Sequence, residues 1–142
     1  MPTIEPFAEV DVSWMAAWLS MIPLCEWPAM ADPSWHGAHE VLSPVVALLM
    51  ERFPGCVPSG PGLFLLAPGQ VHPAHIDEQP PDWVTRVHVP IVTNPQAVAI
   101  TADGEIHMQA GKAYRFDTRR AHAVKNLGPT ARVHLVFDVR SV

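Results

Sequence analysis

The pattern of the chain changes after residue 62, and this change limits the folds that it can adopt. Residues 53–62 contain six Pro or Gly residues, which neither a helix nor a central strand tolerates, so we expect a connector there. Beyond it, short apolar segments follow one another closely, with turn signals such as Asn94-Pro95 and Asp103-Gly104 between them. Short strands at this density favour an antiparallel barrel or sandwich. We expect strands at residues 63–67, 85–93, 97–101, 106–109, 113–117, 122–125 and 132–138.

The first 53 residues have a helical pattern instead. Apolar residues, including Trp14 and Trp18, recur at helical spacing over residues 12–21, and Pro23 ends this segment. We expect further helices at residues 35–42 and 44–52, because Ser43-Pro44 is typical of a cap followed by proline in the first turn. The sequence therefore predicts one mostly β domain over residues 1–142. In it, a jelly roll of residues 60–140 carries a helical layer of residues 1–53 on its outside, with the Trp side chains in the core.

Composition argues against several kinds of partner. The net charge of -5 and the pI of about 5.8 argue against a nucleic-acid binder, because affinity for phosphates comes from clustered Lys and Arg. The longest apolar stretch, residues 14–24, is interrupted by Ser20 and Pro23 and is shorter than the ~20 residues that a membrane span needs. We find no export signal. We therefore expect a cytoplasmic protein in which Cys25 and Cys56 are reduced thiols.

Three residues form a candidate metal site. His75 and Asp77 are two positions apart, so on an extended backbone both side chains leave the same face of the strand. His122 opens a later strand that can return beside the first in a jelly roll. Taken singly, each residue has a simpler interpretation, since a lone His is usually a core or surface group and Asp77-Glu78 could be an acidic loop. Together they supply two imidazoles and one carboxylate, the ligand set of non-haem Fe(II) oxygenases.

Two strands repeat a local pattern. Residues 86–91 and 132–137 each place Arg and His on one face and apolar residues on the other. Either the apolar face fills the barrel and the Arg/His face meets water, or the apolar face lies under the helices and the Arg/His face points into the barrel. In the second case the buried guanidinium groups of Arg86 and Arg132 need an anion nearby. A dicarboxylic cosubstrate would provide one.

Motifs spread over residues 60–140 resemble those of a known family. In order, they are Leu66-Ala67-Pro68-Gly69, Pro73-x-His75-x-Asp77, Arg86-Val87-His88-Val89-Pro90, Phe116-Asp117, His122-x-Val124-x-Asn126 and Arg132-x-His134-Leu135. In this order and spacing they resemble the aspartyl/asparaginyl β-hydroxylase family of 2-oxoglutarate oxygenases, which also contains hydroxylases of free proline. The mammalian aspartyl hydroxylases lack the carboxylate ligand, so Asp77 makes the chain more similar to the small bacterial amino-acid hydroxylases.

The resemblance implies a fold, a site and a reaction. The fold is a cupin-like double-stranded β-helix, and the reaction is hydroxylation of an unactivated C–H bond by a dioxygenase that uses Fe(II), 2-oxoglutarate and O2 and releases succinate and CO2. The implied iron ligands and catalytic residues are His75, Asp77 and His122. The implied cosubstrate residues are Arg132, which would hold the distal carboxylate, with Arg86 and His88 beside it.

The substrate is less constrained than the reaction. Arg119 and Arg120 precede His122, and either could hold a substrate carboxylate or be a solvated surface charge. The short chain favours a free amino acid or short peptide as substrate over a folded protein. The alternative is a non-catalytic cupin-like ligand-binding or sensor module. Other metal-using cupins usually show His-x-His and a nearby Glu, whereas this chain has His-x-Asp.

Overall fold

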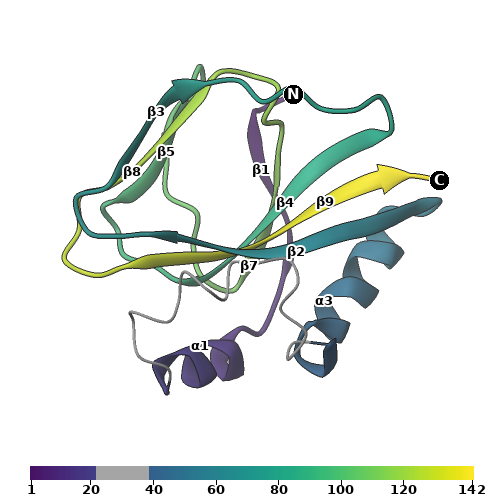
Figure 1. Ribbon diagram of the computed structural model, residues 1–142, viewed down its shortest axis with the longest axis horizontal. Coiled ribbons are helices and arrows are strands. Elements are labelled where there is room, and N and C mark those ends of the chain that lie inside the picture. Colours follow the sequence, from purple (N-terminus) through teal and green to yellow (C-terminus); the bar gives the residue numbers. More distant parts are fainter. Residues whose placement is uncertain (22–38) are drawn as a thin grey trace.

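Two antiparallel sheets form the body of the protein (Figure 1). The computed structural model describes residues 1–21 and 39–142. One sheet contains, in order, β1 (Ile4–Glu9), β7 (Lys112–Phe116), β4 (Trp83–Val92), β9 (Arg132–Ser141) and β2 (Cys56–Leu66). The other contains β3 (Val71–His75), β8 (His122–Asn126), β5 (Ala97–Thr101) and β6 (Gly104–Ile106). The arrangement is a double-stranded β-helix, which confirms the predicted fold class.

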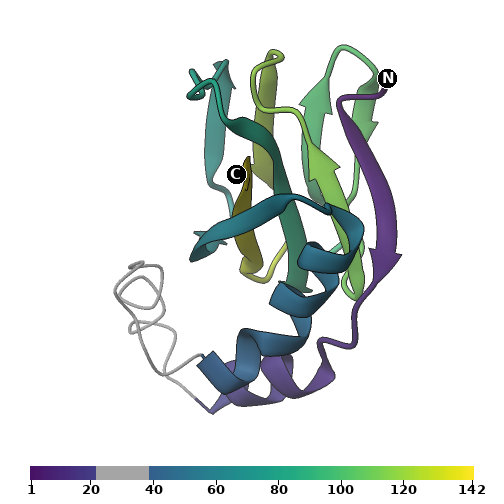
Figure 2. The ribbon, with the colours of Figure 1, turned by 90° about the vertical axis from the view of Figure 1, so that its right-hand side faces the viewer.

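The helices α1 (Ser13–Ser20) and α3 (His39–Arg52) pack on the outer face of the five-stranded sheet (Figure 2). Leu19 and Leu49, each 1% exposed, belong to the same apolar cluster as Val87 of β4 and Leu135 of β9. Because successive strand residues point to opposite faces, the Arg and His residues of β4 and β9 point toward the space between the two sheets. Of the two orientations that the sequence left open, the structure has the second.

The segment expected as a connector is a strand in the structure. Residues 56–66 form β2, and the prediction of no strand before residue 63 is wrong. Among the described strands, β2 pairs only with β9 and lies at the edge of its sheet, where a proline does not interrupt a second ladder. The register shifts between Ser59 and Gly62, at a point where Gly60 has a φ of 99°. This irregularity accommodates the residues that a central strand would exclude.

The N-terminal layer also differs from the expectation. Residues 4–9, expected within a purely helical layer, form β1 and pair with β7. The predicted break before Pro44 is wrong, because α3 runs through that residue from His39. Leu42, Val45 and Leu49 lie on one buried face across Pro44, and their packing offsets the lost backbone hydrogen bond. The predicted helix at 35–42 begins in residues 35–38, which lie outside the described part of the chain, as does Cys25; Cys56 carries a free thiol.

Two smaller expectations also fail. Trp14 is 37% exposed rather than in the core, because Met15 and Leu19 of α1 take the face that meets the sheet. The strand expected at 106–109 ends at Ile106, after which Met108 turns inward to the apolar cluster between the sheets.

The described residues contain no helix long and apolar enough to cross a membrane.

Candidate metal centre

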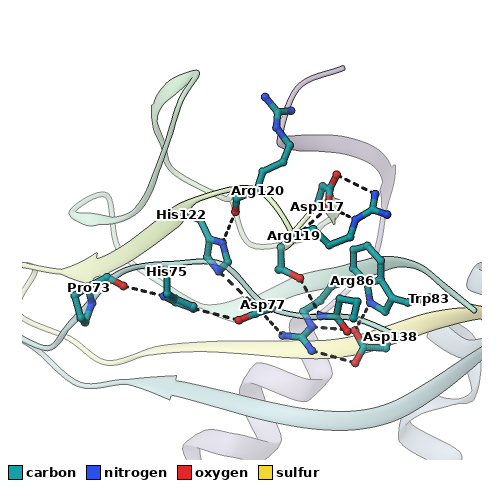
Figure 3. Close-up of polar contacts among 12 residues, drawn as sticks. Pro73, His75, Asp77, Trp83, Arg86, Asp117, Arg119, Arg120, His122 and Asp138 are labelled. Atoms are coloured by element: carbon teal, nitrogen blue, oxygen red, sulfur yellow. Dashed lines mark hydrogen bonds and ion pairs between the residues drawn. The ribbon is translucent and has the colours of Figure 1, made fainter. Parts of the chain in front are cut away.

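The predicted metal ligands lie together where β3 ends and β8 begins (Figure 3). The pairing of β3 with β8 places His75 opposite His122, and Asp77 follows two residues after His75. His75 Nε2 lies 3.4 Å from Asp77 Oδ1, and His122 Nε2 lies 4.0 Å from Asp77 Oδ2. One potential ligand atom from each residue falls within 4.8 Å of the other two, and no second trio of this kind occurs in residues 1–21 and 39–142.

Both imidazoles are held in the tautomer that a metal ligand needs. His75 Nδ1 lies 2.8 Å from the Pro73 carbonyl oxygen, and His122 Nδ1 lies 2.8 Å from that of Arg120. A carbonyl oxygen only accepts hydrogen bonds, so each Nδ1 donates its proton, and in the neutral ring Nε2 is the nitrogen with the lone pair. Both Nε2 atoms face Asp77, as Figure 3 shows. Two ring nitrogens and a carboxylate therefore face one position, where all three could bind a cation.

A bulge in β3 adds a residue to the site. His72 pairs with Val124 and His75 pairs with His122, so the register shifts by one residue between the two pairs. This shift places His72 on the same inward face as His75. Strict alternation would have put these residues on opposite faces, so the sequence pattern did not indicate His72 or the neighbouring Gln70. Proline inside a strand is the one signal that indicated a bulge, and Pro73 is that residue.

A hydrogen-bond network holds Asp77 beside the histidines. Its backbone N–H donates to the Thr118 carbonyl oxygen at 2.9 Å, and Arg86 Nη1 lies 3.4 Å from its Oδ2. Arg86 is itself paired with Asp138 through Nε at 2.9 Å and Nη2 at 3.1 Å. Although burial alone would raise the pKa of the Asp138 carboxyl, hydrogen bonds from Arg86 and Trp83 keep it below its usual value. The guanidinium of Arg86 therefore lies between two carboxylates.

A cavity of about 570 Å³ extends from the triad into the space between the sheets. Arg132 lines it and is 7% exposed, and its Nε has no hydrogen-bond partner. Burial lowers the pKa of Arg132 to about 10, so the side chain remains a cation at neutral pH. No carboxylate of the described residues forms an ion pair with it. A buried guanidinium that lines a cavity without a carboxylate partner has the charge and the donors to hold an anion.

Two buried histidines line or adjoin this cavity. His88 lines the cavity, and its Nδ1 lies 3.0 Å from Nδ1 of the buried His134. Burial, with a further contribution from the charge of Arg132, holds the pKa of both imidazoles well below the usual value. Both rings are therefore neutral at physiological pH. Arg132 carries the cavity's one positive charge that no carboxylate in the described part of the chain balances.

Comparison with known families shows the family of the chain. The family model of aspartyl/asparaginyl β-hydroxylase matches residues 24–141, which is most of the 142-residue sequence. The chain belongs to the aspartyl/asparaginyl β-hydroxylase family. This confirms the resemblance seen in the sequence and places the chain in a family of hydroxylases. No curated protein matches it.

Solved structures share the fold of this aspartyl/asparaginyl β-hydroxylase family member. A viral collagen prolyl hydroxylase from Paramecium Bursaria Chlorella virus-1, in complex with 2-oxoglutarate, has a TM-score of 0.65 at 14% identity, covering 99% of this chain and 97% of that one. A Pseudomonas putida prolyl-4-hydroxylase has a TM-score of 0.62 at 16% identity, covering 99% and 89%. The non-haem monooxygenase ThoJ, in a nickel complex, has a TM-score of 0.63 at 16% identity, covering 98% and 74%. At these identities the similarity shows the fold.

In this member of the aspartyl/asparaginyl β-hydroxylase family, the two predicted substrate residues are engaged elsewhere. Arg119 donates to both oxygens of Asp117, at 2.9 and 3.1 Å, and its guanidinium lies 4.9 Å from the centre of the Trp83 ring. Arg120 donates to the Met1 carbonyl oxygen at 2.7 Å and points away from the triad (Figure 3). Neither side chain lines the cavity. Contact of Arg119 or Arg120 with a substrate stays a prediction.

Proposed function

We propose that the protein is an Fe(II)- and 2-oxoglutarate-dependent dioxygenase that hydroxylates an unactivated C–H bond of an amino acid or peptide side chain. One observation carries this proposal. The His75, Asp77 and His122 side chains line the same cavity as the buried, unpaired Arg132. A cation and a dicarboxylate can bind next to each other where a metal site and an anion site share one cavity.

The donor set fits iron. Two imidazole nitrogens and one carboxylate are the protein ligands of non-haem Fe(II) oxygenases, and they leave further positions open for other ligands. Here His75, Asp77 and His122 would hold the metal. The two backbone carbonyls that accept from the Nδ1 atoms orient the rings before any metal binds. We infer that the site is organised in advance for a divalent cation.

The charge distribution fits a dicarboxylate. The chain has nine Lys and Arg residues, all within the described part, and only Arg86 and Arg132 line the cavity. Arg86 is already paired with Asp138, so Arg132 is the cation available to an anionic ligand. Its planar fork matches a carboxylate through two parallel hydrogen bonds, which Lys cannot reproduce. The neutral His88 is placed to add a polar contact in the same cavity.

The protein's part in the reaction is to bind, orient and protect. When bound, iron and 2-oxoglutarate supply the oxidative chemistry, in which O2 and 2-oxoglutarate yield succinate, CO2 and one oxygen atom for the substrate C–H bond. Arg132 would fix the cosubstrate at one end, and the triad would fix the metal. Apolar residues, among them Leu66 and Phe116, line the cavity between the triad and Arg132 and would limit the access of water to it. The substrate would enter beside His72 and Gln70, which line the cavity and are exposed.

An anaerobic titration tests the proposal. We expect Fe(II) and 2-oxoglutarate together to produce a weak visible charge-transfer band, and air to produce succinate. The absence of both would overturn the proposal. The band without any succinate, under every substrate condition tried, would instead support a non-catalytic binding module.

A substrate screen follows from a positive result. We propose a free amino acid or short peptide as substrate. A panel of both, assayed for 2-oxoglutarate-dependent mass gain of one oxygen atom, identifies the substrate class. Hydroxylation of folded proteins alone would contradict this part of the proposal.

A further inference from the structure

The guanidinium of Arg86 lies between the candidate metal ligand Asp77 and a second carboxylate, Asp138 (Figure 3). Asp138 accepts from Nε at 2.9 Å and from Nη2 at 3.1 Å, so it takes one complete edge of the fork. Asp77 faces only the remaining Nη1, at a longer distance of 3.4 Å. Arg86 is thus bound strongly by Asp138 and weakly by Asp77.

Asp138 is fixed by its surroundings. It lies opposite Arg86 in the pairing of β4 with β9, so neighbouring strands set the distance between the two side chains. Trp83 Nε1 donates to Asp138 Oδ1 at 3.0 Å, and Trp83 is 5% exposed. The guanidinium of Arg119 covers the Trp83 ring at 4.9 Å. A chain of contacts therefore leads from an exposed arginine to the metal ligand.

This geometry points to a positioning role for Asp138. We propose that Asp138 binds and neutralises Arg86 and so prevents it from forming a full ion pair with Asp77, which keeps the Asp77 carboxylate available to a metal ion. The inference rests on the proposed function, because it concerns the same metal site. It adds a residue outside the cavity to the groups that set metal affinity.

The physical argument is a competition for one carboxylate. Without Asp138, the positive charge of Arg86 would have Asp77 as its nearest anionic partner among the described residues. A cationic fork and a divalent cation would then compete for the same two oxygens. Residues that orient a metal ligand typically change metal affinity by about 10- to 100-fold when they are removed.

The test measures metal affinity directly, with Co(II) alone as the probe and no cosubstrate. We expect Asp138→Asn to raise the Co(II) Kd by about tenfold or more. The double variant Arg86→Gln/Asp138→Asn removes the competing cation as well, so we expect it to bind Co(II) more tightly than Asp138→Asn alone. A residue that merely supported the fold would show no such rescue. Thermal unfolding of each variant, monitored by circular dichroism, shows whether it is folded.

A matched control is available beside the same pair of strands, because Asp82 directly precedes β4 and Arg140 lies on β9. Asp82→Asn breaks the ion pair between Asp82 and Arg140, whose atoms lie 3.5 Å apart and which does not contact the triad. We expect its Co(II) Kd to equal that of the unmodified protein. An unchanged Kd in Asp138→Asn, or a double variant as weak as the single one, would overturn the inference. Failure of the unmodified protein to bind Co(II) would overturn the proposed function, and the positioning role with it.

Discussion

His75 on β3 lies directly opposite His122 on β8, with the two ring centroids 4.3 Å apart. The two residues are far apart in the sequence, and the pairing of the two strands brings them together. Each ring is also oriented by a carbonyl oxygen two residues before it in the chain. The long-range pairing therefore sets the distance, and the local backbone sets the tautomer.

Removal of the carboxylate ligand should abolish metal binding. We expect Asp77→Ala to lose measurable Co(II) binding in a calorimetric titration, because two imidazoles alone supply no negative charge to offset that of the ion. His122→Ala should have the same effect. His107→Gln is the control, since His107 bonds to the Ala97 carbonyl oxygen and lies outside the cavity. Tight binding in Asp77→Ala would show that the metal ligands are wrongly assigned.

Arg132→Gln should weaken cosubstrate binding without lowering the stability of the ligand-free protein. We expect the 2-oxoglutarate Kd to rise by about 30-fold or more, since loss of one partner of a buried charge pair costs about 2–5 kcal/mol. Without ligand, the melting temperature should stay the same or rise, because a buried guanidinium with an unpaired Nε is removed. Arg140→Gln, on the same strand but outside the cavity, should leave the 2-oxoglutarate Kd unchanged. An unaltered Kd in Arg132→Gln would mean that the cosubstrate binds elsewhere.

Acid should weaken the metal-free fold through His88 and His134. Burial lowers the pKa of both imidazoles well below 6.5, so below pH 6.5 the unfolded chain binds more protons than the folded one. The free energy of unfolding should therefore fall with falling pH, by about 1.4 kcal/mol per pH unit for each histidine.

Urea unfolding in the presence of a chelator, from about pH 7 to pH 5, measures this slope. His134→Gln should remove about half of it. His72→Gln, which alters an exposed imidazole, should leave it unchanged. A profile without any slope in this range would show that the buried rings titrate normally.

Asn126 should prove structural. Its side chain is fully buried, donates to the carbonyl oxygens of Leu66 and Thr130, and accepts from Asn94 and the Gly128 backbone. We expect Asn126→Ala to lower the free energy of unfolding by about 3 kcal/mol, because these partners are left unsatisfied in the interior. Gln96→Ala, at an exposed position, should change it by less than about 0.5 kcal/mol. Chemical denaturation compares the two, and equal effects would contradict this account.

Local patterns were sufficient for most strands. Residues 97–101 match β5 at both ends, and the alternation of Arg and His with apolar residues located β4 and β9. They were not sufficient for β2, because composition alone does not show that a strand lies at a sheet edge, where proline is tolerated. They also missed β1, whose place in the sheet depends on pairing with the distant β7.

The candidate site divides in the same way. The side-chain types of His75, Asp77 and His122 indicated a metal site, because their chemistry can be read from the sequence. In the same way, Arg132 indicated an anion site. Strand order and register placed these groups in one cavity, turned His72 inward through a bulge, and set Asp138 against Arg86. Chemistry belongs to each side chain and can be recognised from its type, whereas distance and burial depend on contacts between residues far apart in the chain. The sequence therefore indicated which ligands to seek, and the folded structure established which residues could act on them together.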